Sequence, residues 1–87
     1  GLYSTAADVT RFYRMMLNGG ALDGKRILAE ESAREMTKVH TGDMRAGFTE
    51  SMGFGHAFAV VRKPEGATAS LSAGSFGHGG AFGTQSW

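Results

Sequence analysis

The stretch that decides the fold is Gly74-Ser75-Phe76-Gly77-His78-Gly79-Gly80-Ala81-Phe82-Gly83. It places one titratable side chain, His78, among five glycines. Glycine lets a backbone approach a ligand closely and adopt torsion angles that other residues avoid. A glycine-rich strand or turn with a single histidine is therefore a candidate wall of a reaction site. The wall alone is incomplete, because a histidine needs a nucleophile or a metal ion to carry out chemistry.

The size and charge of the chain limit its class. Its 87 residues make one small domain at most. A net charge of +1 argues against nucleic acid as a partner, since nucleic-acid binding requires a basic face. Every Lys, Arg, Asp and Glu lies at or before Glu65, so residues 66–87 carry no such charge. We expect this tail to be either buried in something larger or poorly soluble, because exposed sheet edges are normally protected by charge or proline.

The chain offers few clues to its compartment. It has no cysteine, which excludes disulfides and thiolate chemistry. No apolar run approaches the roughly 20 residues of a transmembrane helix, and no signal peptide is present. The chain begins at Gly1 rather than Met, so a leader could lie upstream, and it ends at Trp87 without a turn or a charged cap. These features predict an excerpt of a larger protein.

The first predicted element is a helix at about residues 6–18. Thr5 and Asp8 have the spacing of a capping box, with Asp in place of the usual Glu or Gln. The apolar residues behind them repeat at helical spacing: Val9, Phe12, Tyr13, Met16 and Leu17. Asn18-Gly19-Gly20 should end the helix, because glycine readily supplies the left-handed residue after the last turn.

A tight turn and a second helix are expected next. Asp23-Gly24 suits a turn with positive φ at both central positions. The second helix should span about residues 30–39, with Ala33 and Met36 facing inward and acidic and basic residues paired on its solvated face. The polar, unpatterned residues 40–52 should form a loop.

The rest of the chain is predicted to form an antiparallel sheet. Bulky and small residues alternate over residues 54–61, which is typical of a strand. Pro64-Glu65-Gly66 should turn the chain, and residues 68–75 and 80–87 are two further expected strands. Two helices followed by a glycine-rich meander predict an α+β fold.

The positions of the histidines and of Ser75 bear on two other kinds of site, a metal site and a nucleophile elbow. His40, His56 and His78 are 16 and 22 residues apart, which matches no compact zinc pattern, so no metal site and no cofactor are expected. Ala73-Gly74-Ser75-Phe76-Gly77 is close to a nucleophile elbow, in which Ser75 would be the nucleophile of an α/β-hydrolase esterase. An elbow must lead from a strand into a helix, however, and the glycine-rich residues after Ser75 are poor helix formers. His78 could also be a polar residue satisfied within the sheet.

A resemblance that runs through the whole chain favours one function. Its parts are Gly1-Leu2-Tyr3-Ser4-Thr5-Ala6-Ala7-Asp8 before the first helix, Leu17-Asn18-Gly19-Gly20, Leu22-Asp23-Gly24-Lys25-Arg26-Ile27-Leu28, and Gly77-His78-Gly79-Gly80. Their order and spacing resemble the later part of serine hydrolases of the β-lactamase superfamily. The nearest branch is the class C-like one, which includes β-lactamase-fold esterases and D-stereospecific peptidases. The resemblance implies an excerpt of the β-lactamase and penicillin-binding-protein-like transpeptidase fold.

The resemblance also implies roles for four residues. The superfamily's third motif, Lys-Thr-Gly or His-x-Gly, lies on a strand that lines the pocket, and His78-Gly79-Gly80 matches it. His78 would then support proton transfer or bind substrate, and Gly79 and Gly80 would let substrate lie close to the strand. The backbone N–H of Ala81 would form half of an oxyanion hole, in which one donor contributes about 3–4 kcal/mol.

The chain departs from the superfamily pattern in two respects. It contains no Ser-x-x-Lys, and no Tyr-x-Asn follows Tyr3 or Tyr13. The nucleophile and its base are therefore expected outside the chain, in the remainder of its own catalytic domain. Histidine in place of lysine also removes a permanent positive charge, which argues for ester or amide substrates over carboxylate-bearing β-lactams.

The prediction is thus part of a serine hydrolase that acts on a small-molecule ester, amide or peptide through an acyl-enzyme. The resemblance implies a periplasmic or secreted parent protein. The isolated chain is expected to be inactive, since covalent catalysis needs an activated nucleophile beside its base. The alternative is a non-catalytic interaction module whose uncharged tail adds strands to a partner. A module should fold cooperatively with its tail, whereas an excerpt should be marginally stable or associate through it.

Overall fold

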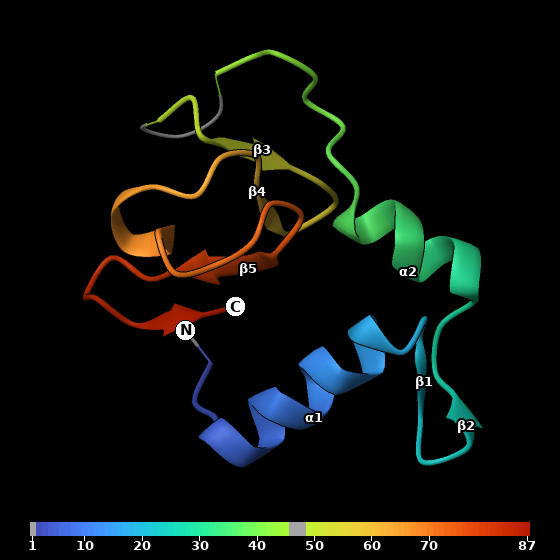
Figure 1. Ribbon diagram of the computed structural model, residues 1–87. Helices are drawn as coiled ribbons and strands as arrows, with labels where there is room; N and C mark the ends of the chain where they lie inside the picture. The colour runs from blue at the N-terminus through green and yellow to red at the C-terminus, as the bar shows by residue number, and fades with distance from the viewer. Residues whose placement is uncertain (1, 46–48) are drawn as a thin grey trace. The chain divides into compact units, whose positions relative to one another are not determined.

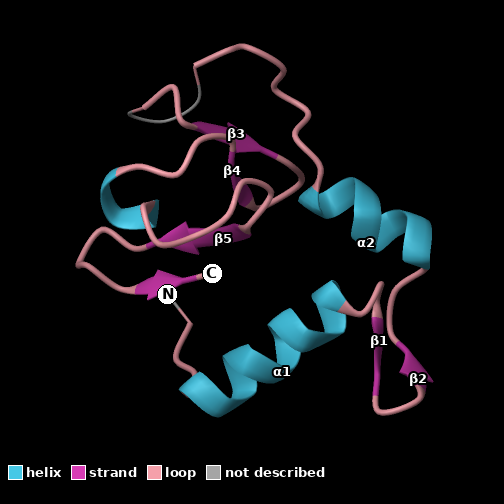
Figure 2. Cartoon of the chain, viewed as in Figure 1, coloured by secondary structure: helices cyan, strands magenta, loops and turns pink. Residues whose placement is uncertain are grey.

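A computed structural model describes residues 2–45 and 49–87 (Figure 1). Gly1, and residues 46–48 of the predicted loop at 40–52, lie outside the described residues. The chain divides into two compact units, residues 1–34 and 35–87. Two α-helices and antiparallel strands make up the units, which is the α+β class that the sequence predicts (Figure 2).

The first helix, α1, spans Ala6–Leu17, where the sequence predicts about 6–18. The Thr5 hydroxyl oxygen accepts a hydrogen bond from the Asp8 backbone N–H at 3.2 Å, which caps the helix N-terminus. At the other end Gly19 and Gly20 have φ of +69° and +94°, and the Gly20 N–H donates to the Met15 carbonyl at 2.9 Å. The two glycines therefore end the helix, as the sequence predicts.

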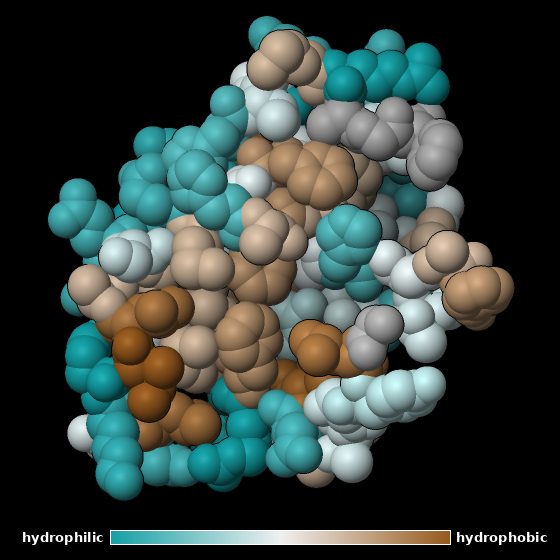
Figure 3. Space-filling view, turned by 180° about the vertical axis from the view of Figure 1, so that it is seen from behind, coloured by the Kyte–Doolittle hydropathy of each residue, from teal (hydrophilic) through white to brown (hydrophobic). Residues whose placement is uncertain are grey.

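The buried face of α1 differs from the predicted stripe. Met15 and Met16 are the buried residues of the helix. Phe12 and Leu17, which the periodicity places inside, are 45% and 74% exposed. Apolar side chains thus remain on the surface of this unit, and Figure 3 shows apolar residues among polar ones on the face it displays.

A short hairpin follows α1. Strands β1 (Ala21–Leu22) and β2 (Lys25–Arg26) pair antiparallel. Asp23 and Gly24 have φ of +50° and +78°, the positive values that the Asp-Gly turn requires.

The second helix, α2, spans Glu30–Thr37 and buries Ala33. Ion pairs link Arg34 to Glu30 at 3.7 Å and Lys38 to Glu35 at 3.8 Å. The helix ends before the predicted residue 39. Near the end of the helix, the backbone carbonyl oxygen of Glu35 accepts a hydrogen bond from the ring Nε2 of His40 at 2.7 Å.

A four-stranded antiparallel sheet in the order β3-β4-β5-β6 fills the second unit (Figure 1). Its strands are β3 (Met52–Phe54), β4 (Ala59–Val61), β5 (Phe76–Gly79) and β6 (Gln85–Ser86). Its core contains Val61, 1% exposed, and the rings of Phe58 and Phe76, which meet edge to face at 5.1 Å.

The predicted single strand at 54–61 is wrong. The chain reverses within it, so that Phe54 of β3 pairs with Ala59 of β4. The Gly55 N–H donates to the Phe58 carbonyl at 2.9 Å, and Ala57 takes a φ of +72°. Alternating bulky and small residues gave no turn signal, and the hairpin depends on a tertiary contact. A Cβ on Gly55 would collide with the Met36 carbonyl of α2, so only glycine lets the turn pass this helix end.

The two later strands also need correction. A 3₁₀ turn, η1 (Gly66–Thr68), and irregular backbone replace the predicted strand at 68–75, and β5 begins at Phe76. The Thr68 hydroxyl donates to the Glu65 carbonyl at 2.9 Å and stabilises the turn. Within the predicted strand at 80–87 only Gln85–Ser86 is a strand, because residues 80–84 form a turn. No helix in the described part of the chain is long and apolar enough to cross a membrane.

Candidate functional site

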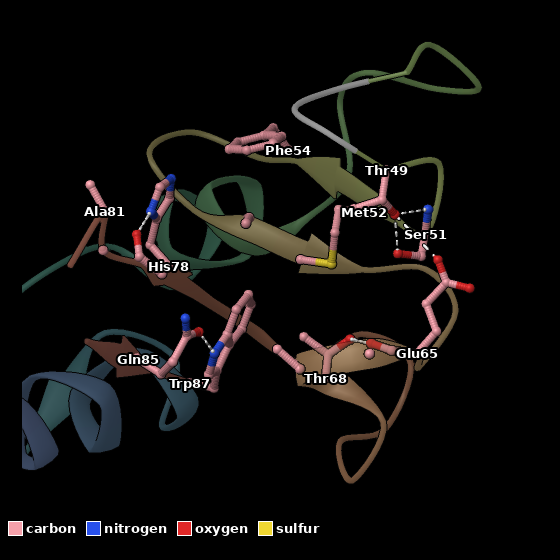
Figure 4. Close-up of a pocket in the computed structure, with 15 residues that line it drawn as sticks. Thr49, Ser51, Met52, Phe54, Glu65, Thr68, His78, Ala81, Gln85 and Trp87 are labelled. Carbon is pink, nitrogen blue, oxygen red and sulfur yellow. Dashed lines mark hydrogen bonds between the residues drawn. The ribbon is translucent and has the colours of Figure 1, made fainter. Parts of the chain in front are cut away.

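His78 lies on β5, where it pairs with Ser86 of β6, and its side chain is exposed. Its ring Nδ1 lies 2.6 Å from the carbonyl oxygen of Gly79 (Figure 4). A carbonyl oxygen can only accept, so Nδ1 is the protonated nitrogen of this hydrogen bond. In the neutral ring the lone pair is then on Nε2, which can accept a proton or a hydrogen bond.

The turn after β5 leaves the Ala81 N–H without an acceptor among the described residues. The Gly80 N–H donates to the Thr84 carbonyl at 2.7 Å, and the Gly80 carbonyl accepts from Gly83 at 3.1 Å. Both backbone groups of Gly80 are therefore used within the turn. The next N–H, that of Ala81, has no acceptor among the described residues and is available to a ligand.

The glycines of β5, and Gly80 directly after it, make room for β6 and for the turn that leads into it. A Cβ on Gly77 would collide with the Ser86 carbonyl oxygen, and one on Gly80 would collide with the Thr84 hydroxyl. A Cβ on Gly79 would lie 2.8 Å from Nε2 of Gln85. Glycine is therefore favoured at these positions because the chain packs closely on itself here, a requirement that the sequence alone did not indicate.

A pocket of about 860 Å³ lies in the second unit, next to these residues (Figure 4). The backbone from His78 to Ala81 lines one end of it. The His78 and Phe54 rings meet edge to face at 6.0 Å. The remaining lining comes from β3, β4, β6, η1 and the residues flanking them: Thr49, Ser51, Met52, Phe54, Ala59, Glu65, Gly66, Ala67, Thr68, Gln85 and Trp87. The structure therefore brings all four predicted site residues to one pocket.

A polar cluster lines the part of the pocket away from His78 (Figure 4). The hydroxyls of Thr49 and Ser51 form a short hydrogen bond, and the Thr49 hydroxyl donates to the Glu65 carboxylate at 3.3 Å. Sequence reasoning missed these three residues, because residues 40–52 show no periodicity and the structure alone brings Glu65 beside Thr49.

The histidines do not form a joint site. The rings of His40 and His56 lie 4.4 Å apart beside the end of α2, and the His56 N–H donates to the Met36 carbonyl at 3.0 Å. Among residues 2–45 and 49–87, no group of three or more His, Cys, Asp and Glu side chains is placed to hold a metal ion.

Ser75 lacks the surroundings of a nucleophile elbow. The residue leads directly into strand β5, whereas an elbow leads into a helix. Its backbone extends the pairing of β5 with β4, because the Ser75 carbonyl accepts from the Val61 N–H at 2.8 Å. The esterase alternative with Ser75 as nucleophile thus has no support in the fold.

Comparison with known proteins places the chain in a family. The family model described as Beta-lactamase matches residues 1–87. Two curated relatives from Mycobacterium tuberculosis are 40% identical to the chain over 94 aligned residues: "Uncharacterized protein MT1414" from strain CDC 1551 / Oshkosh and "Protein Rv1367c" from strain ATCC 25618 / H37Rv. The alignments cover 100% of this chain and 22% of each relative, so the chain spans about a fifth of their length. The chain belongs to the beta-lactamase family.

Proposed function

We propose that the chain forms one wall of the acyl-transfer site of a serine hydrolase. The main support is the arrangement at the end of β5, where His78 and Ala81 line the same pocket and the Ala81 N–H has no acceptor among the described residues. Membership of the beta-lactamase family supports a hydrolase as the parent protein.

In this proposal His78 takes part in proton transfer or binds substrate. Its Nδ1–H is held by the Gly79 carbonyl, which fixes the ring and leaves Nε2 as the acceptor in the neutral form. A fixed acceptor is what a residue needs to assist a nearby proton transfer. The ring is exposed, so a substrate or a further segment of the catalytic domain has access to it.

The Ala81 N–H is proposed as one donor of the oxyanion hole. Such donors act on the negative charge that develops on the carbonyl oxygen during acyl transfer. The internal hydrogen bonds of the turn hold Gly80 and so position the peptide that follows it. Gly79 and Gly80 are proposed to let substrate approach the strand, on the side that β6 does not occupy.

The nucleophilic serine and its lysine are proposed to lie in the remainder of the catalytic domain. None of the serines in the 87 residues has a lysine three positions later. The proposed substrate is a small-molecule ester, amide or peptide. Glu65 is the only acidic residue among the described residues that line the pocket, and none of these residues is a lysine or arginine that could hold a carboxylate such as that of a β-lactam.

The test is covalent labelling of the full-length parent protein. The protein is treated with a fluorophosphonate, digested, and the labelled residue is located by mass spectrometry. We expect the label on a serine that precedes a lysine by three residues and lies outside residues 1–87. A label on Ser75 would instead support the elbow, and an unlabelled protein would favour an interaction module or an inactive family member.

A further inference from the structure

The side chain of Gln85 crosses the strand that carries His78. Gln85 of β6 pairs with Gly79 of β5 in the antiparallel register. Its Nε2 lies 2.8 Å from the position that a Cβ on residue 79 would occupy, so the carboxamide rests on the Gly79 backbone. Gln85, Gly79 and His78 all line the pocket. A polar side chain is thereby placed beside the proposed reaction site.

Trp87 fixes the orientation of this carboxamide. The indole Nε1 donates to Gln85 Oε1 at 2.8 Å. An indole N–H can only donate, so the amide oxygen must face it and the amide nitrogen must point the other way. Figure 4 shows the nitrogen of Gln85 directed away from the indole. Among the described residues no group accepts a hydrogen bond from Nε2, so its two hydrogens are available.

The pocket's charges indicate which acceptor suits this donor. Of the described residues that line it, Glu65 and His78 are the titratable ones. A substrate carboxylate would find no lysine or arginine there and would share the pocket with the Glu65 carboxylate, which repels it. A neutral carbonyl oxygen has no such cost and matches the neutral N–H donor.

We propose that Gln85 is a substrate-binding residue that donates from Nε2 to the carbonyl oxygen of an amide in the acyl group of the substrate, and that Trp87 is the positioning residue that holds the carboxamide in this orientation. The substrate class is then an N-acylaminoacyl ester or a peptide. This inference rests on the proposed acyl-transfer function, because it assigns Gln85 to the same site.

The test compares two esters on the full-length parent protein. 4-Nitrophenyl N-acetylglycinate carries an amide in its acyl group, and 4-nitrophenyl butyrate has a similar length without one. Gln85→Glu keeps the acceptor for Trp87 but loses the donor, and Gln85→Met loses both without adding charge. We expect each variant to lower kcat/KM for the N-acetylglycinate about fivefold, the loss of one neutral hydrogen bond, and to change the butyrate less than twofold.

The role of Trp87 is tested through Gln85. Trp87→Phe keeps an aromatic ring but removes the N–H that orients the carboxamide. It should lower the preference for the N-acetylglycinate about twofold in the wild-type background and leave it unchanged in Gln85→Met, because the two residues act as one unit. Equal losses on both esters, or an unchanged preference in the Gln85 variants, would overturn the proposal.

Failure of the proposed function would give a different result. A parent protein that cleaves neither ester and takes no fluorophosphonate label contradicts the hydrolase, and Gln85 is then examined by binding. In the parent protein labelled with ¹⁵N-glutamine, the carboxamide signal pair that disappears in Gln85→Met is assigned to Gln85. N-acetylglycinamide should shift this pair in the wild type and much less in Trp87→Phe. Absence of a shift in the wild type overturns the role of Gln85.

Discussion

At the scale of single residues, the glycines of β5 differ in what surrounds them. The Cβ of an alanine at position 77 would meet backbone atoms of Ser86 and Trp87, which cannot move without separating β5 from β6. At position 79 the nearest atoms belong to the end of the Gln85 side chain, which can rotate away. Two neighbouring glycines in one strand therefore have different tolerance of a methyl group.

This difference predicts unequal effects on stability. Gly77→Ala should lower the free energy of unfolding of the parent protein by about 2–3 kcal/mol, the upper part of the range for overpacking, because its neighbours are backbone atoms. Gly79→Ala, the matched control, should lower it by less than about 1 kcal/mol. Urea titration followed by circular dichroism measures both values. Equal losses at the two positions would show that β6 does not pack on β5 as described.

His78 is the residue on which the proposed chemistry depends. His78→Ala removes the ring whose Nδ1–H is bound to the Gly79 carbonyl and whose Nε2 is the proposed acceptor. We expect kcat for 4-nitrophenyl butyrate to fall about 100-fold in the parent protein, the lower end for loss of acid–base assistance, with little change in the free energy of unfolding because the side chain is exposed. His78→Gln, which keeps a polar side chain without a titratable group, is the control. Full activity in both variants would remove His78 from the mechanism.

At the scale of elements, the hairpin of β1 and β2 is a test of turn chemistry. Gly24 has a φ of +78°, and a Cβ there would meet no atom within 4 Å. Any cost of a larger residue at this position therefore comes from the backbone conformation and not from crowding.

Gly24→Val should destabilise the protein by about 1–2 kcal/mol, because a β-branched residue strongly disfavours positive φ. Gly24→Asn should cost only a few tenths of a kcal/mol, since asparagine tolerates this conformation. The two variants are compared by thermal unfolding. If valine and asparagine behave alike, the turn does not require positive φ at residue 24.

At the scale of the whole molecule, the sheet depends on the uncharged tail. Residues 66–87 supply β5 and β6, and Phe76 within them packs on Phe58. Without the tail, the hairpin of β3 and β4 is what remains of the four-stranded sheet, and an isolated two-stranded hairpin is marginally stable in water.

A chain truncated to residues 1–65 should therefore lose the second unit. We expect far-UV circular dichroism to show less strand signal than in the 1–87 chain, and amide hydrogens of Ala59–Val61 to exchange without protection. The 1–87 chain measured in parallel is the control. Protection of β4 in the truncated chain would mean that the hairpin is stable without β5.

Membership of a family whose relatives are much longer also bears on activity. The chain spans about a fifth of the curated relatives' length and has no Ser-x-x-Lys. We predict that the isolated 87-residue chain neither hydrolyses 4-nitrophenyl butyrate above background nor takes up fluorophosphonate. The full-length parent protein is the positive control. Stoichiometric labelling of the isolated chain would contradict the view that the nucleophile lies elsewhere.

The sequence alone determined the elements whose causes are local. The Thr5 cap, the glycine stop after α1 and the Asp23-Gly24 turn each depend on residues within a few positions of one another, and the structure has all three. The α+β class and the family also follow from local patterns and their order along the chain.

Only the tertiary structure decided where the sheet reverses and what surrounds the site. The hairpin at Gly55 exists because the turn packs against the end of α2, and the glycines of β5 are needed because β6 lies against them. Gln85, Trp87 and the cluster around Glu65 reach the pocket through pairings and contacts between distant segments. Such contacts leave no periodic signal in the sequence, since each depends on which strands pair and in which register.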